Sequence, residues 1–220
     1  MVVSISFLCR LLMEFNDEIT SAFEHLLTSV RSVRRRIDFK REVEDSVLLN
    51  CINIAVQAPT GRGEEGWYFL VVKERQKIKA ISEVYREVLL EFVEKADTPM
   101  KSSHRALMDR LGEFPALIFA CKAGAPEEGF ASQAAYFGSI LPAAWSLMIA
   151  LRAQNIGATW TTLLTVRHHR VSEILGMPSS ARQLVMLPVG YTHEAVLKKA
   201  DRKDASEVTF LNEWGNPFSR

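Results

Sequence analysis

Arginines and a hydroxyl gather in the short segment Arg31-Ser32-Val33-Arg34-Arg35-Arg36. A guanidinium group is a planar fork of N–H donors that binds phosphate oxygens in pairs, and a neighbouring hydroxyl can add a further hydrogen bond. The Arg-Ser-x-Arg spacing therefore predicts a site for a phosphate-bearing ligand, with Arg31, Ser32 and Arg34 as the contacts. The alternative interpretation is a solvated basic turn without a ligand.

The glycines of Gly61-Arg62-Gly63-Glu64-Glu65-Gly66 have the spacing of a dinucleotide-binding loop. Such a loop needs a strand before it and a helix after it, so that the helix N-terminus faces the pyrophosphate. Here the pattern predicts a helix before the loop and a strand after it. Glu64 and Glu65 would also place negative charge where phosphates belong. We therefore interpret the segment as a flexible loop that precedes a strand.

Other signatures of catalysis are scarce. His168 and His169 are adjacent, so their side chains are expected to diverge and not to share a metal ion, and no Cys or acidic ligand stands at a useful spacing. The sequence contains no nucleophile-elbow, phosphate-loop or zinc-protease pattern. We expect no metal site and no hydrolase mechanism.

The spacing of apolar residues predicts more helices than strands. One helix is expected over about residues 16–29, capped by Asn16 or Asp17, from four apolar residues on one face: Ile19, Phe23, Leu26 and Leu27. Further helices are expected near residues 48–56, 78–88, 106–111 and 129–151. Strands are expected at residues 67–72, 116–121, 158–163, 184–189 and 208–210. Helices and strands do not alternate one for one, as a doubly wound sheet requires, so we assign the α+β class.

The composition is that of an ordinary globular chain. Of the 220 residues, 48% are hydrophobic and 24% are charged, and no repeat or Gly/Ser-rich linker divides them, so we expect a single domain over residues 15–220. The net charge of +1 argues against a general nucleic-acid binder. The three cysteines, Cys9, Cys51 and Cys121, lack the spacing of a disulfide framework or a zinc site, which favours a reducing cytoplasm.

Two apolar stretches resemble membrane or targeting signals. Residues 2–12 have no basic residues before them and no cleavage site after them, so we expect residues 1–14 to be a disordered or extended segment and not a signal peptide. Residues 129–151 carry no charge and are long enough to span a bilayer, but serines, a glutamine and Pro142 interrupt them. We expect a core helix wrapped by other elements or by a second subunit, and no membrane partner.

Four segments in this order together resemble the flavin-dependent nitroreductase family. The first is Leu26-Leu27-Thr28-Ser29-Val30-Arg31-Ser32-Val33-Arg34-Arg35, and the second combines Ala58-Pro59-Thr60 with Gly66-Trp67-Tyr68-Phe69. The others are Gly157-Ala158-Thr159-Trp160-Thr161-Thr162-Leu163 and Leu187-Pro188-Val189-Gly190-Tyr191. The resemblance extends over about residues 15–212.

This resemblance implies a central, mostly antiparallel sheet flanked by helices, in a homodimer that binds FMN at the subunit interface. The helix over residues 129–151 would lie in the dimer core. Arg31, Ser32 and Arg34 match the family's phosphate-binding motif, and Arg202 resembles a basic residue that closes on the same phosphate. The loop that reaches the flavin from the other subunit would comprise Pro59, Thr60 and Gly61. The segment facing the N5 edge of the ring would comprise Trp160, Thr161 and Thr162.

The activity implied is that of an FMN-dependent NAD(P)H oxidoreductase. It would reduce nitroaromatic, quinone or similar electron-poor small molecules by ping-pong hydride transfer, with the flavin and no catalytic side chain carrying the chemistry. One departure matters, because Gly63 and Glu65 stand where relatives carry Asn and Gln. An amide that could orient the flavin is thus missing, and acidic charge nearby would disfavour an anionic reduced flavin.

Three alternatives stay open at this stage. One is a non-catalytic dimer that binds or sequesters flavin. Another is a specialised flavin reaction on the same scaffold, such as reductive dehalogenation, double-bond reduction or flavin breakdown. The third is a nucleic-acid contact through the arginines of residues 31–36, which the near-neutral total charge opposes.

Overall fold

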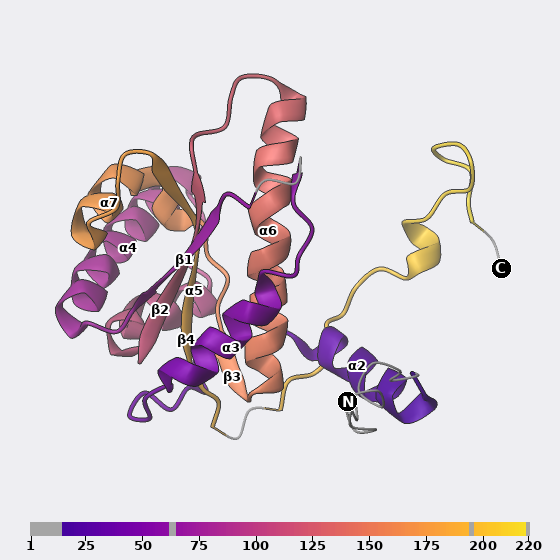
Figure 1. The fold of residues 1–220 in the computed structure, drawn as a ribbon, viewed down its shortest axis with the longest axis horizontal. Helices are drawn as coiled ribbons and strands as arrows, with labels where there is room; N and C mark the ends of the chain where they lie inside the picture. The colour runs from indigo at the N-terminus through magenta and orange to yellow at the C-terminus, as the bar shows by residue number, and fades with distance from the viewer. Residues whose placement is uncertain (1–14, 62–64, 194–195, 219–220) are drawn as a thin grey trace, which may run out of the picture. The chain divides into compact units, whose positions relative to one another are not determined.

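The computed structural model describes residues 15–61, 65–193 and 196–218 (Figure 1). The chain divides into two compact units, one of residues 1–29 with 197–220 and the other of residues 30–196. The single domain expected over residues 15–220 stays a prediction. The N-terminal segment expected over residues 1–14 lies outside the described residues.

The smaller unit contains the helix α2 (Asp17–Ser29) and the 3-10 turn η4 (Ala205–Glu207). Of the two predicted caps for α2, Asn16 fills the role: its Oδ1 accepts a hydrogen bond from the Ile19 N–H at 2.9 Å. The apolar face of α2 stays largely open, with Phe23 50% exposed.

The strand predicted at residues 208–210 is wrong. Phe210 forms only an isolated bridge with Pro217. Two hydrogen bonds, from Leu211 N–H to the Asn216 carbonyl and from Phe218 N–H to the Thr209 carbonyl, close a short turn instead.

The larger unit is built on a four-stranded sheet in the order β1-β2-β4-β3. The strands are β1 (Trp67–Val72), β2 (Ala116–Ala123), β3 (Ile156–Ala158) and β4 (Ala181–Tyr191). Every neighbouring pair is antiparallel. The predicted α+β class and antiparallel central sheet are confirmed.

Strand β3 ends at Ala158, five residues before the predicted end at residue 163. Thr159 N–H still donates to the Pro188 carbonyl of β4 at 3.2 Å, but Pro188 has no N–H to return the bond. Pairing resumes only at Thr161, which exchanges both backbone hydrogen bonds with Met186. The proline in the partner strand therefore shortens β3 and leaves residues 159–162 as an irregular segment at the sheet.

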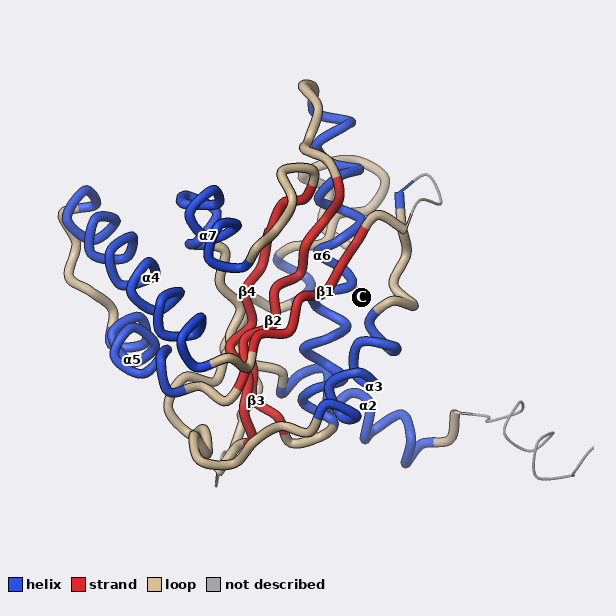
Figure 2. Tube along the Cα trace, turned by 60° about the vertical axis from the view of Figure 1, so that its left-hand side comes forward, coloured by secondary structure: helices blue, strands red, loops and turns tan. Residues whose placement is uncertain are grey.

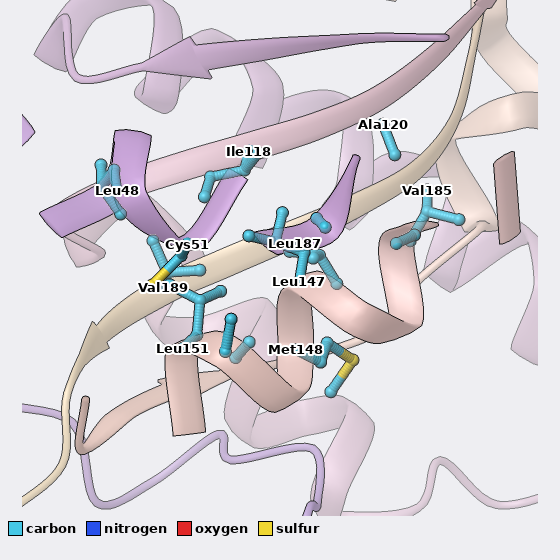
Figure 3. Close-up of a cluster of buried hydrophobic side chains, with 14 of the residues drawn as sticks. Leu48, Cys51, Ile118, Ala120, Leu147, Met148, Leu151, Val185, Leu187 and Val189 are labelled. Carbon is cyan, nitrogen blue, oxygen red and sulfur yellow. The ribbon is translucent and has the colours of Figure 1, made fainter. Parts of the chain in front are cut away.

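Helices cover both faces of this sheet (Figure 2). One layer holds α3 (Asp45–Ala55) and α6 (Phe130–Ala153). The opposite layer holds α4 (Arg75–Ala96), α5 (Ser102–Arg110) and α7 (His168–Leu175). Alternate residues of β2 and β4, among them Ile118 and Leu187, pack against Leu147 of α6 (Figure 3).

Helix α6 is the predicted apolar helix. By length and hydropathy it could cross a membrane, and half of its most apolar 18-residue window is buried inside the unit. Ile140, Leu147 and Leu151 are fully buried against the sheet, whereas Phe130 and Trp145 are exposed. The helix is therefore wrapped on one side, and its other side presents aromatic surface.

Cys51 and Cys121 are both buried. Burial raises the pKa of the Cys121 thiol to about 12. A thiol that stays protonated does not react, because the thiolate is the nucleophile. We expect iodoacetamide at pH 8 to alkylate Cys121 about 1000-fold more slowly in native than in denatured protein, given an ordinary value of 9.0. A Cys9→Ser background with mass spectrometry of each thiol checks this, and rapid native labelling of Cys121 would contradict the described packing.

Candidate functional site

The predicted phosphate motif is fixed to the edge of the sheet next to β3. Ser32 forms a parallel bridge with Ala158, and Val33 N–H donates to the Ala158 carbonyl at 2.9 Å. The fully buried Thr159 adds a bond from its Oγ1 to the Val33 carbonyl at 2.7 Å. The segment that carries the arginines is thereby fixed along its backbone, while its side chains remain available.

Backbone alternation joins this motif to the second predicted cluster. Thr159 and Thr161 point their N–H groups at β4, so the N–H of Trp160 between them points the opposite way. It donates to Ser32 Oγ at 3.2 Å. The structure thus brings Ser32 next to Trp160, and the Ser32 hydroxyl keeps its proton for a further acceptor.

Arg34 is the least satisfied side chain of this site. Its Nε is buried and has no hydrogen-bond partner among the described residues. Its Nη1 makes only a long bond, 3.4 Å, to the Ser32 carbonyl. Burial lowers the pKa of Arg34 from its ordinary value, with a smaller lowering from Arg35. A half-buried cation with an unused donor is costly unless an anion completes it.

The neighbouring Arg31 is half-buried and donates from Nη1 to the Val30 carbonyl at 2.5 Å. Within the described part of the chain this is its one hydrogen bond, which leaves most of the five guanidinium N–H donors for a ligand. The fork of Arg31 and the unused donor of Arg34 flank Ser32 in sequence. Together they supply the donors that the sequence assigns to a phosphate.

Sequence reasoning missed two residues that face Arg34. Tyr85 of α4 is 3% exposed, and burial raises the pKa of its hydroxyl, while the Arg34 charge and a hydrogen bond with Thr161 lower it in part. Burial first, then Arg34, lowers the pKa of His104 in α5. The only signal for Tyr85 in the sequence is a hydroxyl inside an otherwise aliphatic helical stripe.

The predicted loop of Pro59, Thr60 and Gly61 lies elsewhere on the same chain. It follows α3, and Gly61 N–H donates to Ser139 Oγ of α6 at 2.9 Å. Among the described residues no hydrogen bond or ion pair joins this loop to the arginine motif, and its predicted approach to a flavin from a second subunit stays a prediction. Glu65 is exposed to solvent, and Gly63 and Glu64 lie outside the described residues.

The remaining predicted contacts have separate surroundings. Thr162 is exposed and its carbonyl accepts hydrogen bonds from Thr165, at the start of η3 (Leu163–Arg167). Arg202 is exposed and belongs to the smaller unit. Its predicted closure on a phosphate stays a prediction.

The prediction that His168 and His169 diverge is wrong. Their ring centroids lie 3.8 Å apart, with the planes tilted by 39°. The pair begins α7, and His168 itself has helical dihedral angles, so the rings meet through their side-chain torsions and not through an irregular backbone. Burial, then His169, lowers the pKa of His168.

The larger unit thus holds an arginine-serine motif beside an irregular Trp-Thr-Thr segment. Both lie on an antiparallel sheet between two helical layers. The model of the nitroreductase family matches residues 27–191. The chain belongs to the nitroreductase family. The match includes both the arginine motif and the end of β4, and it confirms the family indicated by the sequence motifs.

Iodotyrosine deiodinases are similar in sequence to this nitroreductase-family chain. The protein from Drosophila melanogaster is 29% identical over 176 residues, which cover 74% of this chain and 60% of the fly protein. The chain thus spans less than two thirds of that relative's length. Iodotyrosine deiodinase 1 from Mus musculus is 30% identical over 198 residues, covering 84% of this chain and 68% of the mouse protein.

A solved structure agrees with the fold. Oxidised iodotyrosine deiodinase bound to FMN and 3-iodo-L-tyrosine superposes with a TM-score of 0.65 at 22% identity, covering 82% of this chain and 95% of that one. At this identity the likeness concerns the fold alone. It supports the nitroreductase-like architecture of the chain.

Proposed function

We propose that this nitroreductase-family chain is an FMN-dependent reductase that performs a specialised reaction on a small molecule, with reductive dehalogenation of an aromatic substrate as the leading candidate. The observation that carries the proposal is the convergence of Arg34, Ser32 and the Trp160-Thr161 backbone at one place. The curated deiodinase relatives favour dehalogenation over generic nitro reduction.

The residues present fit the phosphate of FMN. This group carries about two negative charges at neutral pH, and guanidinium forks bind such oxygens bidentately. The Nε of Arg34 is buried and has no partner in the part of the chain that is described, so it is the kind of donor that a phosphate or ribityl oxygen would complete. Arg31 and the hydroxyl of Ser32 supply further donors from the same backbone turn.

The chain's own residues bind and orient in this proposal. Arg31, Ser32 and Arg34 hold the phosphate end, and the irregular segment of residues 160–162, joined to Ser32 through the Trp160 N–H, lies beside them and faces the ring. Tyr85 is buried beside Thr161 and Arg34 and packs behind the site. When bound, FMN supplies the electrons for the reduction, so no catalytic acid or nucleophile from the chain is required.

In the leading reaction, the carbon–iodine bond of an aryl iodide breaks and iodide leaves. A proton takes the place of iodine on carbon, and two electrons are consumed. The reductant is reduced flavin, generated by NADH, NADPH or dithionite.

The test uses the FMN-loaded protein under anaerobic conditions. It is reduced with dithionite, mixed with 3-iodo-L-tyrosine, and assayed for iodide release and for the return of oxidised-flavin absorbance. Iodide released in step with flavin reoxidation supports the proposal. Reduced flavin that persists, with no iodide, overturns this substrate class.

The second candidate is the NAD(P)H-dependent reduction of nitroaromatic or quinone compounds, favoured by the family match itself. It predicts rapid flavin reduction by NADH or NADPH and reoxidation by a nitroaromatic, with ping-pong kinetics. If neither acceptor reoxidises the flavin, a binding or sequestering role replaces both reductases.

A homodimer belongs to this proposal, because among the described residues the loop of residues 59–61 is bonded to α6 and not to the arginine motif. The uncovered side of α6 supports it, since Trp145 is 43% and Phe130 is 89% exposed. Exposed apolar surface of this kind is typical of a subunit interface.

Replacing Trp145 with alanine is expected to raise the dimer dissociation constant by about 30-fold, since an interface tryptophan commonly contributes about 2 kcal/mol or more. Sedimentation equilibrium over a range of protein concentrations measures this change. Phe92→Ala is the matched control, because Phe92 is a comparably exposed aromatic residue on α4, on the opposite helical layer. Equal effects of the two substitutions would refute an interface at α6.

A further inference from the structure

The loop of residues 59–61 is attached to α6 through one side chain. Gly61 N–H donates to Ser139 Oγ at 2.9 Å. The approach is close enough that a Cβ on Gly61 would lie 3.1 Å from Ser139 Oγ and 3.2 Å from the Ala135 carbonyl oxygen. The loop backbone therefore rests directly on the surface of α6 at this point.

The Ser139 hydroxyl is used in both directions. It accepts from Gly61 and donates to the Ala135 carbonyl at 2.8 Å, and the residue is only 2% exposed. The bond to Ala135 fixes the orientation of the hydroxyl, so its lone pairs face the loop. A buried serine in this arrangement joins a loop to a rigid helix.

Other buried polar side chains among the described residues make similar connections. Thr159 joins the segment of Ser32 to β3 through the Val33 carbonyl, and Gln183 of β4 donates to the Leu164 carbonyl of η3, just after residues 160–162. The first contact holds the phosphate motif, and the second holds the turn that follows residues 160–162. Ser139 is the corresponding contact for the third such segment.

We propose that Ser139 is a positioning residue that holds Gly61, and with it Thr60 and Pro59, at the place along α6 from which they contact the flavin. This inference rests on the proposed function, because it requires FMN at the site. A buried hydrogen bond to a fixed helix lowers the entropy that the loop would lose on binding.

The experiment compares the full-length protein with its Ser139→Ala variant. FMN affinity is measured by quenching of flavin fluorescence, and the absorbance spectrum of bound flavin is recorded at saturation. We expect Ser139→Ala to raise the FMN dissociation constant by about 2- to 10-fold, the worth of one ordinary hydrogen bond. We also expect a shifted spectrum, which lower stability alone would not produce. Ser146→Ala, at a half-buried serine of the same helix, is the matched control and should change neither readout.

A second variant approaches the contact from the loop. Gly61 does not need a left-handed backbone, so Gly61→Ala acts through the steric contact with Ser139 and Ala135. Its effect and that of Ser139→Ala should be less than multiplicative in the double variant, because both disturb one contact. Independent, multiplicative effects would overturn the proposal.

Hydrogen exchange at the Gly61 amide separates the possible failures. We expect protection in the wild type and faster exchange in Ser139→Ala, with or without FMN. A protein that protects this amide but binds no FMN refutes the proposed function. A protein that binds FMN with the same affinity and spectrum whether residue 139 is Ser or Ala refutes the positioning role.

Discussion

Replacing Arg34 with alanine is expected to weaken FMN binding by about 10- to 150-fold, because a lost charge-assisted hydrogen bond is worth roughly 1.5–3 kcal/mol. The reason is that this guanidinium is partly buried and that its Nε finds no partner among residues 15–61, 65–193 and 196–218, which leaves it poorly satisfied without an anion. Fluorescence titration of the FMN-free protein at fixed ionic strength measures the change.

Two further variants show whether the effect belongs to the geometry of Arg34. Arg35→Ala removes an adjacent but exposed arginine, and we expect little change in FMN affinity. Arg34→Lys keeps the charge but loses the planar fork, so an intermediate loss is expected. If Arg34→Ala and Arg35→Ala weaken binding equally, a general electrostatic patch replaces the specific site.

The other large effect concerns stability. Leu147 of α6 is fully buried against the sheet (Figure 3). Leu147→Ala should lower the free energy of unfolding by about 2–5 kcal/mol, through lost apolar burial and the cavity left behind. Urea denaturation of the FMN-free protein, followed by circular dichroism, gives this difference.

Leu147→Met is the matched control, since it preserves volume and should cost less than about 1.5 kcal/mol. A Leu147→Ala protein as stable as the wild type would mean that α6 is not packed on the sheet as described. The frame that carries Ser139 would then be in doubt as well.

The prediction of a phosphate site at the arginine motif rests on local chemistry. Arg31, Ser32 and Arg34 lie within four residues, so their types and spacing already indicate a phosphate site. The structure adds the reason why this motif lies beside the Trp160 segment, since Ser32 pairs with Ala158 across more than a hundred residues of sequence. The β1 strand and the buried α6 helix were also predictable, because continuous apolar runs indicate buried elements.

The end of β3 could not be predicted from its own residues. Thr159 to Leu163 is a good strand sequence, and the interruption comes from Pro188 in the partner strand. Only the register, in which Ala158 pairs with Val189, brings this proline opposite Thr159. The strand propensity of residues 159–163 thus predicts a strand, but the missing N–H of Pro188 interrupts the pairing.

Tyr85 and Ser139 were missed for a related reason. In the sequence, Tyr85 is one more aromatic residue in the apolar stripe of α4, and Ser139 is a polar interruption of the hydrophobic helix α6. Their roles depend on Arg34 and Gly61, which reach them only through the fold. The contacts of a buried polar side chain have no periodic signature in the sequence.

The most direct measurement is the amount of FMN that remains with the purified chain after reconstitution with excess FMN and gel filtration. Arginines 31 and 34 around Ser32 predict one tightly held FMN for each chain, and its loss when both arginines are replaced by alanine. Flavin that elutes entirely free from the folded wild-type protein would contradict the proposed site.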